Sequence, residues 1–216
     1  AWNNLALVYM QQQHFAQAEK AFHKAIRYQP RYEEAWFNLG KLYAQQNQED
    51  QAIHAYTKAI EIRPDYIRAK VNLAVRYAKQ DKYTDAKRLY QSVLKQDARH
   101  ANAWLNLGLA EFKENNSNAA IVALTRALEL EPENVKIKRY LAKSLQKQNK
   151  NEQAVQLMFD VVNANTADIE LRLELAQTLS AAERIVEAIA ELEKARKLDP
   201  GNAAIENELK KLHTRH

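Results

Sequence analysis

The chain has 216 residues, with 32 basic and 27 acidic side chains and a formal net charge of +5. It holds no Cys, which excludes disulfides and cysteine-bound zinc, and no stretch approaches the roughly 18 apolar residues that a membrane-spanning helix needs. Only 3 Gly and 4 Pro occur, against roughly 15 and 11 from average usage, which disfavours a multi-stranded sheet. The many Ala, Leu, Gln, Lys and Glu residues favour an all-α protein. We expect a soluble protein; its compartment stays open, with the cytoplasm placed slightly ahead of the periplasm.

A period of 34 residues organises the chain from its first residues onward. All three tryptophans share one phase of this period: Trp2, Trp36 and Trp104. All four prolines share another phase: Pro30, Pro64, Pro132 and Pro200. Such regularity predicts a repeat architecture.

Three further positions become regular when Trp2 is taken as the fourth position of a repeat. The seventh position is Leu six times: Leu5, Leu39, Leu73, Leu107, Leu141 and Leu175. The eighth is always Ala or Gly and the twentieth is always Ala, as expected where two helices pack closely. This pattern, Trp-x2-Leu-Gly-x2-Tyr, then Ala-x3-Phe, then Pro, resembles the tetratricopeptide repeat family over nearly the whole chain.

The resemblance implies an all-α, right-handed superhelical solenoid of helix-turn-helix repeats. Six repeats are expected, at residues 1–32, 33–66, 67–100, 101–134, 135–168 and 169–202. The pattern is strongest in repeats one, two and four. Lys70, Lys138 and Arg172 stand in place of Trp in the other three, without breaking the phase.

The two ends of the predicted array differ. Residues 203–216 are expected to form a capping helix and a tail, because Ile205, Leu209 and Leu212 share one helical face. The front of the first repeat has no equivalent cap. The chain is therefore either trimmed from a longer array or exposes an apolar end that can dimerise.

The resemblance also implies that the first helix of each repeat lines a concave groove. Position 6, which faces this groove, is Asn in four consecutive repeats: Asn4, Asn38, Asn72 and Asn106. An amide both donates and accepts hydrogen bonds, so the row could bind the backbone of an extended peptide. It resembles the asparagine ladder in the repeat region of O-linked N-acetylglucosamine transferases. The alternative is that these amides stabilise neighbouring helices or face water.

An apolar strip is predicted beside this row. It consists of Phe37, Val71, Leu105 and Leu109. Its rim is basic and includes Lys41, Arg68, Arg76, Lys79 and Lys113. Such a strip suits an amphipathic helix or an extended segment with acidic flanks. The alternative is packing between neighbouring first helices.

Charge is unevenly spread along the second half. Residues 133–150 hold six basic residues and one Glu, whereas residues 168–193 hold seven acidic residues and two Arg. Arg139 and Lys143, with Lys136 and Lys147, occupy groove positions and could bind an acidic peptide or another anionic polymer. The alternative is that the basic and acidic segments neutralise each other.

No catalytic constellation is visible, because three glycines cannot supply a phosphate-binding loop and the six His residues are scattered. We predict a non-enzymatic scaffold, without cofactor or metal ion, that binds a peptide segment of a partner protein in its groove, either alone or as one region of a larger protein. One rival is RNA binding in the manner of pentatricopeptide repeats through the basic fifth repeat, against which the constant 34-residue spacing argues. Another is self-assembly through the uncapped N-terminal repeat.

Overall fold

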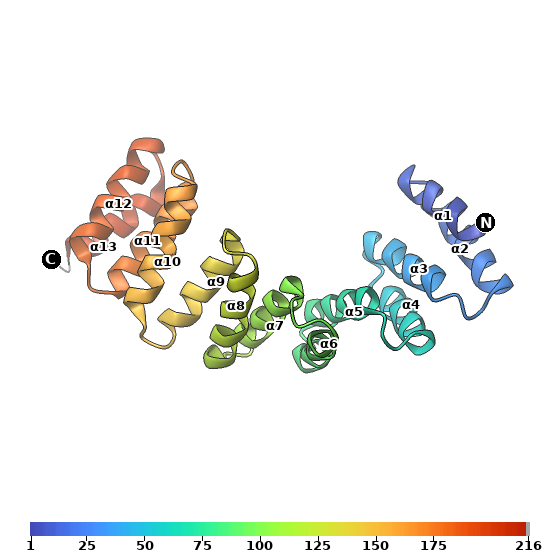
Figure 1. Ribbon diagram of the computed structural model, residues 1–216. Coiled ribbons are helices and arrows are strands. Elements are labelled where there is room, and N and C mark those ends of the chain that lie inside the picture. The colour runs from blue at the N-terminus through green and yellow to red at the C-terminus, as the bar shows by residue number, and fades with distance from the viewer. Residues whose placement is uncertain (215–216) are drawn as a thin grey trace. The chain divides into compact units, whose positions relative to one another are not determined.

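The computed structural model describes residues 1–214, and this part of the chain consists of helices without a strand (Figure 1). The helices are α1 (Trp2–Gln11), α2 (Phe15–Tyr28), α3 (Glu33–Gln45), α4 (Glu49–Ile62), α5 (Ile67–Lys79), α6 (Tyr83–Gln96), α7 (Ala101–Lys113), α8 (Ser117–Leu130), α9 (Val135–Gln146), α10 (Asn151–Ala164), α11 (Ile169–Ala181), α12 (Ile185–Leu198) and α13 (Ala203–His213). The predicted all-α fold of helix-turn-helix repeats is confirmed. Within residues 1–214, every helix is too short or too polar to cross a membrane. Positions 215–216 of the predicted tail lie outside the described residues.

The 34-residue period governs the helices themselves. The odd-numbered helices from α3 to α13 begin at 33, 67, 101, 135, 169 and 203, and the even-numbered ones begin at 15, 49, 83, 117, 151 and 185. The capping helix α13 therefore starts in the phase of a first helix. Its residues Ile205, Leu209 and Leu212 are buried, as the sequence predicts.

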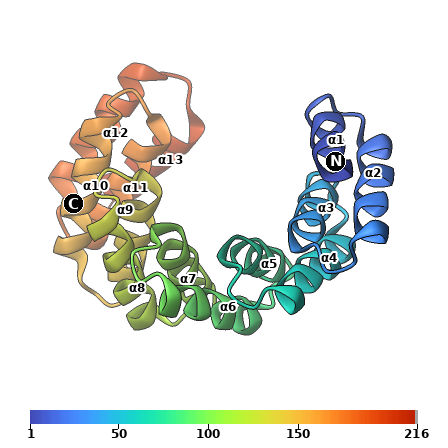
Figure 2. The same ribbon diagram turned by 45° about the vertical axis from the view of Figure 1, so that its right-hand side comes forward.

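The chain divides into two compact units, unit 1 (Ala1–Ala110) and unit 2 (from Glu111 onward). In unit 1, the first helices α1, α3 and α5 lie along one side and the second helices α2, α4 and α6 along the other (Figure 2). In unit 2, α9 and α11 lie along one side and α8, α10 and α12 along the other (Figure 2). We call the side lined by first helices the A face of each unit.

One turn type joins first to second helices throughout. Its central residue has a positive φ in every case: Gln13, Asn47, Asp81, Asn115, Asn149 and Glu183. The next N–H then donates to the carbonyl five residues earlier, as Gln48 N does to Tyr43 O at 2.9 Å. This is the Schellman arrangement, which satisfies carbonyls at a helix end. Asn and Asp tolerate a positive φ better than Gln or Glu do. Four of these turns therefore form with Asn or Asp in place of glycine, whereas Gln13 and Glu183 adopt the conformation at a higher cost.

Small residues at the eighth position let the two helices of a hairpin close. A Cβ atom on Gly40 of α3 would lie 2.7 Å from the Tyr56 ring of α4, nearer than real Cβ contacts come. Tyr56 is fully buried, and burial raises its pKa to about 12. The glycine thus makes room for a large ring in the core of this hairpin.

The fourth position carries a hydrogen-bond donor with a recurring target. The Trp36 indole Nε1 donates to the Pro30 carbonyl at 3.1 Å, six residues earlier. In repeat six, the Arg172 guanidinium donates to the equivalent Thr166 carbonyl at 2.7 and 3.0 Å. Its charge is balanced by the buried Glu191, whose carboxylate lies 2.6 Å away. Arginine therefore replaces the indole while keeping its hydrogen bond.

Lysine at the fourth position finds other partners. Lys70 is buried and donates to Ser92 Oγ at 2.8 Å on the second helix of its hairpin. Lys138 lies 3.6 Å from Glu133, which is at the end of the preceding repeat. The departures from Trp noted in the sequence thus each retain a polar partner.

Candidate peptide-binding faces

The A faces are built by a register between successive first helices. In unit 1, Asn38 Nδ2 on α3 donates to Asn3 Oδ1 on α1 at 3.2 Å, and both amides are about 5% exposed or less. In unit 2, Arg139 on α9 reaches Glu174 on α11 at 2.7 Å, with the same separation of 35 residues. Position 5 of one repeat therefore meets position 6 of the next. A side chain at position 6 therefore either contacts the neighbouring first helix or reaches the surface.

The asparagines of the predicted row consequently have different surroundings. Asn38 is occupied by its bond to Asn3 inside unit 1. Asn72 donates to the Arg68 carbonyl of its own helix at 2.8 Å and is half-buried. Asn106 is half-buried and Asn4 is exposed. Three of the four amides thus reach the surface of unit 1, and Asn38 does not.

The predicted apolar strip divides into buried and accessible members. Phe37 and Leu105 are buried, whereas Val71 and Leu109 are half-buried. The Phe37 ring packs against Tyr66 with a centroid distance of 5.1 Å. The contacts of Phe37 therefore support a role in packing between helices. Val71 and Leu109 keep part of their side chains accessible.

A polar cluster that the sequence did not predict covers Phe37. The Tyr66 hydroxyl donates to Glu34 Oε2 at 2.5 Å, and Arg68 Nη2 donates to Glu34 Oε1 at 3.0 Å. Burial and the neighbouring Glu34 raise the pKa of Tyr66, so this hydroxyl remains a donor. The Arg68 guanidinium lies 5.0 Å from the Phe37 ring, and Lys41 Nζ lies 6.0 Å from it and is exposed. Both cations thus lie over an aromatic ring at the edge of the strip.

In unit 2, Arg139 and Lys143 are held by an internal carboxylate. Arg139 forms a two-pronged pair with Glu174, Nε to Oε2 and Nη2 to Oε1, both at 2.7 Å. Lys143 Nζ donates to the same Glu174 at 2.7 Å, and Glu170 accepts from Arg139 at 2.8 Å. Such charge-assisted pairs are the strongest hydrogen bonds in proteins. The two cations of the predicted acidic-peptide site therefore already bind an acidic residue.

The charges of this cluster stabilise one another. Burial disfavours the Glu174 carboxylate, but the hydrogen bonds from Arg139 and Lys143 outweigh it and hold the pKa of Glu174 below its ordinary value. The hydrogen bonds from Arg139 to Glu174 and Glu170 raise the pKa of Arg139 despite its partial burial. Glu174 stands at position 6, where four earlier repeats have Asn, and its contact with Arg139 depends on the register between α9 and α11.

Next to this cluster, two aromatic rings meet on the A face of unit 2. Phe112 and Tyr140 pack edge to face, with centroids 5.5 Å apart. Lys147 Nζ lies 4.3 Å from the Phe112 ring centroid and 2.8 Å from Asn115 Oδ1. Lys147, a further cation of the predicted basic ladder, therefore also has partners within unit 2.

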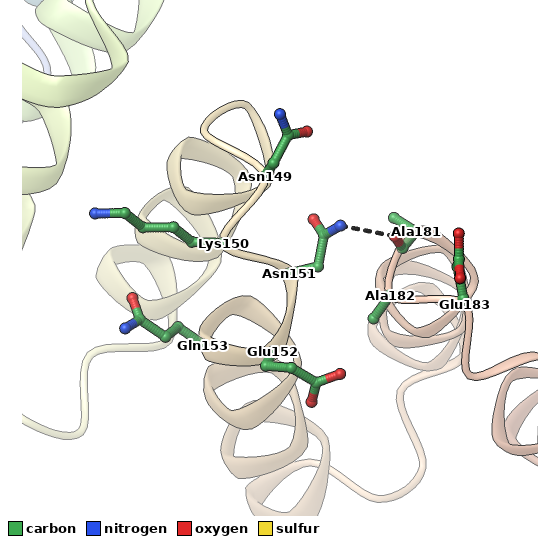
Figure 3. A pocket seen from close by; sticks show the side chains of 8 residues that line it. All are labelled: Asn149, Lys150, Asn151, Glu152, Gln153, Ala181, Ala182 and Glu183. Atoms are coloured by element: carbon green, nitrogen blue, oxygen red, sulfur yellow. Dashed lines mark hydrogen bonds between the residues drawn. The ribbon is translucent and has the colours of Figure 1, made fainter.

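A hollow of about 460 Å³ opens between the turns of repeats five and six (Figure 3). Asn151, at the start of α10, donates across it to the Ala181 carbonyl at 2.7 Å (Figure 3). Arg184 adds a second link, 3.1 Å from Glu152. These contacts tie one hairpin to the next, and the hollow is lined by polar turn residues without an aromatic ring.

The first helix, α1, has apolar side chains that are exposed in this structure. Leu5 is 37% and Val8 is 48% exposed, whereas Leu39 and Leu42, at the same repeat positions in α3, are buried. Self-assembly through this face stays a prediction.

Among the described residues, no group of three or more His, Cys, Asp or Glu side chains is placed to hold a metal ion. The absence of catalytic residues and of a cofactor stays a prediction as well.

Comparisons with known proteins agree with the helical repeat pattern. A family model described as "Tetratricopeptide repeat" matches residues 3–67 and 71–135, and a second model of that description matches 111–172. The fold is similar to that of YrrB, described as a TPR protein with an unusual peptide-binding site, at 20% identity and a TM-score of 0.78, covering 89% of this chain and 99% of that one.

Two further solved structures share the fold. PilW, a type IV pilus biogenesis factor, has 19% identity and a TM-score of 0.77 over 96% of both chains. A tetratricopeptide repeat protein from Parabacteroides merdae has 18% identity and a TM-score of 0.77, covering 99% of this chain and 85% of that one. No curated protein matches the sequence.

Proposed function

Because the chain belongs to the tetratricopeptide repeat family, we propose that it is a non-enzymatic scaffold that holds a peptide segment of a partner protein on the A face of unit 1. The family's fold supports a role in protein–protein interaction. The structurally similar YrrB is described as having a peptide-binding site, which supports a peptide as the ligand class here.

One observation carries the proposal: accessible amides alternate with half-buried apolar side chains on successive first helices. Val71 and Asn72 are adjacent on α5, and Asn106 lies three residues before Leu109 on α7. Amides that both donate and accept would bind the peptide backbone, and Val71 and Leu109 would contact its apolar side chains. Asn4 would extend the row on α1. Asn38 would orient α3 against α1 instead, since its amide binds Asn3.

A preference for acidic flanks would rest mainly on unit 1. Lys41 is exposed beside the strip, and the Arg68 side chain is 61% exposed although it pairs with Glu34. Arg139 and Lys143 would contact a peptide carboxylate only if it displaced Glu174 from them. The same pairing weighs against RNA binding through the fifth repeat, because phosphate binding needs cations that are not already neutralised. The likeness of the row to the glycosyltransferase ladder stays part of this proposal and would apply to Asn4, Asn72 and Asn106.

The test is a selection of peptides followed by matched variants. Peptides that bind the whole chain are isolated from a random phage-displayed library, and their Kd values are measured by calorimetry. We expect the double variant Asn72→Ala/Asn106→Ala to weaken binding roughly tenfold, since each lost hydrogen bond nets about 0.5–1.5 kcal/mol. Circular dichroism confirms that the variant keeps its helices.

The matched control carries the same two substitutions on second helices, Asn118→Ala on α8 and Asn163→Ala on α10, where both side chains are exposed. It should bind with unchanged Kd. Equal binding by wild type, variant and control would overturn the A face of unit 1 as the peptide site.

A further inference from the structure

A cavity of about 330 Å³ in unit 1 lies among α2, α3 and α4. We call it the outer pocket. Its lining residues on α3 are at the fourth, seventh and eleventh repeat positions, whereas the peptide-site residues Val71, Asn72 and Leu109 are at the fifth, sixth and ninth. Its floor is formed by Leu39, Tyr43 and Ala55, all buried, and Trp36, His54 and Asp50 stand around it. The volume falls in the range of about 300–1,000 Å³ that is common for ligand pockets.

The outer pocket has a definite origin in the sequence. Repeat two combines Trp36 at the fourth position with the small Ala55 on the second helix. At the same two places, repeat three has Lys70, which is buried and bonded to Ser92, and the larger Leu89. A small residue opposite an indole therefore leaves space in repeat two. Trp2 and Ala21 form the same pair in repeat one and line a smaller hollow of about 180 Å³, where Lys20 takes the place of His54.

Aromatic rings and imidazoles form the walls. The rings of Trp36 and His54 meet edge to face, with centroids 6.0 Å apart. Tyr43 donates its hydroxyl to Glu19 at 2.8 Å, and His23 Nε2 lies 3.3 Å from the same hydroxyl. Burial and the neighbouring Glu19 raise the pKa of Tyr43, so the hydroxyl stays protonated. The walls are thus electron-rich ring systems on a fixed scaffold.

The charge at the outer pocket is negative. Asp50 lines it, and its Oδ1 accepts only a neutral hydrogen bond, from Gln80 Nε2 at 3.2 Å, with no cation paired to it among the described residues. Neither Lys nor Arg lines the pocket. The nearby Lys24 and Lys58 are engaged elsewhere, Lys24 over the Trp2 ring and Lys58 with Glu61.

We propose that the outer pocket is a second binding site, which takes a lysine or arginine side chain of a partner protein. The aliphatic stem would lie over Leu39 and Ala55, and the cationic head would sit beside the Trp36 ring and the Asp50 carboxylate. Long cationic side chains bury their stems in this way while keeping the head hydrated. Attraction between a cation and an aromatic ring adds to the charge pair. The site is independent of the peptide site on the A face.

The experiment follows the Trp36 indole N–H and the His54 ring signals of the whole labelled chain by NMR. The probe is Nα-acetyl-lysine-N-methylamide, and the matched probe is Nα-acetyl-norleucine-N-methylamide, which has an apolar stem without the charge. We expect saturable shifts with the lysine probe and roughly fivefold weaker binding of the norleucine probe.

Two variants locate the binding. Ala55→Leu places in repeat two the residue that repeat three has at this position, and should abolish the shifts by filling the space. Asp50→Asn keeps the acceptor for Gln80, removes the charge, and should weaken the lysine probe severalfold. If Ala55→Leu does not fold, the Asp50→Asn variant alone tests whether the lysine probe binds in the outer pocket. Asn72→Ala/Asn106→Ala should change nothing, so failure of the A-face proposal is distinguished from failure of this one.

Three results would overturn the proposal. If the lysine probe produces no saturable shifts, the outer pocket does not bind a cationic side chain. Equal affinity for the two probes would make it a pocket for apolar side chains, and an unchanged lysine response in both pocket variants would place the binding elsewhere.

Discussion

Units 1 and 2 build the same hairpin from different chemistry. In unit 1, α3 and α5 begin after Tyr32 and Tyr66, whose side chains do not cap the helix. In unit 2, α9 and α11 begin after Asn134 and Asp168, whose side-chain oxygens accept from the backbone N–H three residues on, at 3.2 and 3.1 Å. Capping of this kind stabilises a helix start by typically about 1 kcal/mol. Unit 1 places aromatic side chains at the same positions, and Tyr66 packs on Phe37 instead.

The same contrast holds on the A faces. Unit 1 pairs two neutral amides, Asn3 and Asn38, in the register where unit 2 pairs Arg139 with Glu174. What the two units share is the position of each contact in the 34-residue period. The 34-residue period therefore determines the hairpin. The residue types at a contact can differ between the units if both contacting residues change together.

The largest expected effect comes from breaking the pair that replaces tryptophan in unit 2. Arg172→Leu leaves the Thr166 carbonyl without its donor and the buried Glu191 with Lys194 as its remaining cation. We expect a loss of about 3 kcal/mol in the free energy of unfolding, as for other broken buried pairs. Urea unfolding with hydrogen exchange of α11 and α12 measures it.

Two further variants sharpen this result. Arg172→Trp/Glu191→Ala recreates the combination found in repeat two and should recover most of the loss. Arg126→Leu breaks an exposed pair with Glu129 and should cost no more than about 1 kcal/mol. A double variant as unstable as Arg172→Leu would show that the chemistry is not exchangeable.

A smaller effect is expected in acid. The pKa of Glu174 is lower in the folded chain than its ordinary value of 4.5, so its contribution is fully present above about pH 4.5 and is lost as the pH falls through the folded-state pKa. We expect α11 to lose roughly 1–2 kcal/mol of protection over this window, the scale of hydrogen bonds to charged groups. Hydrogen exchange of α11 at several pH values measures it. Glu174→Gln should remove this part of the pH dependence, whereas Glu129→Gln on the exposed pair should not; identical pH profiles for all three proteins would contradict the assignment.

The smallest effect concerns the turns with positive φ. Glu183→Gly should stabilise unit 2 by about 0.5 kcal/mol, because glycine adopts this conformation without strain but loses more chain entropy on folding. Asn149→Gly, at the same position of the preceding repeat, should be nearly neutral since Asn already tolerates it. Thermal unfolding compares the two, and an equal gain in both would mean that residue type does not matter at this turn.

The fold could be predicted from the sequence because its signal is a period. Leu5 and Ala18 begin series that recur every 34 residues, and the helices begin at the same intervals. Ile205 and Leu209, which share one helical face in the sequence, are buried on α13. That this helix caps the array stays a prediction.

The candidate site was only partly predictable, because exposure depends on contacts between helices. Position 6 is the same residue in four repeats, yet Asn38 is buried against Asn3 while Asn4 is exposed. The pairing of Arg139 with Glu174 likewise needed the register of α9 and α11. The outer pocket combines the small Ala55 and Trp36, a pair that repeat one shares, with Asp50 and His54. Which of these side chains line one cavity follows from the packing of α3 against α4.

The arginine that replaces tryptophan also has a genetic consequence. The tryptophan codon becomes an arginine codon by one base change, and an alanine codon becomes a glutamate codon equally simply. Lys194, whose Nζ lies 2.6 Å from Glu191, gives that carboxylate a partner even before an arginine arrives. A history in which glutamate came first and arginine second therefore passes through a neutralised intermediate, whereas the reverse order buries an unpaired guanidinium.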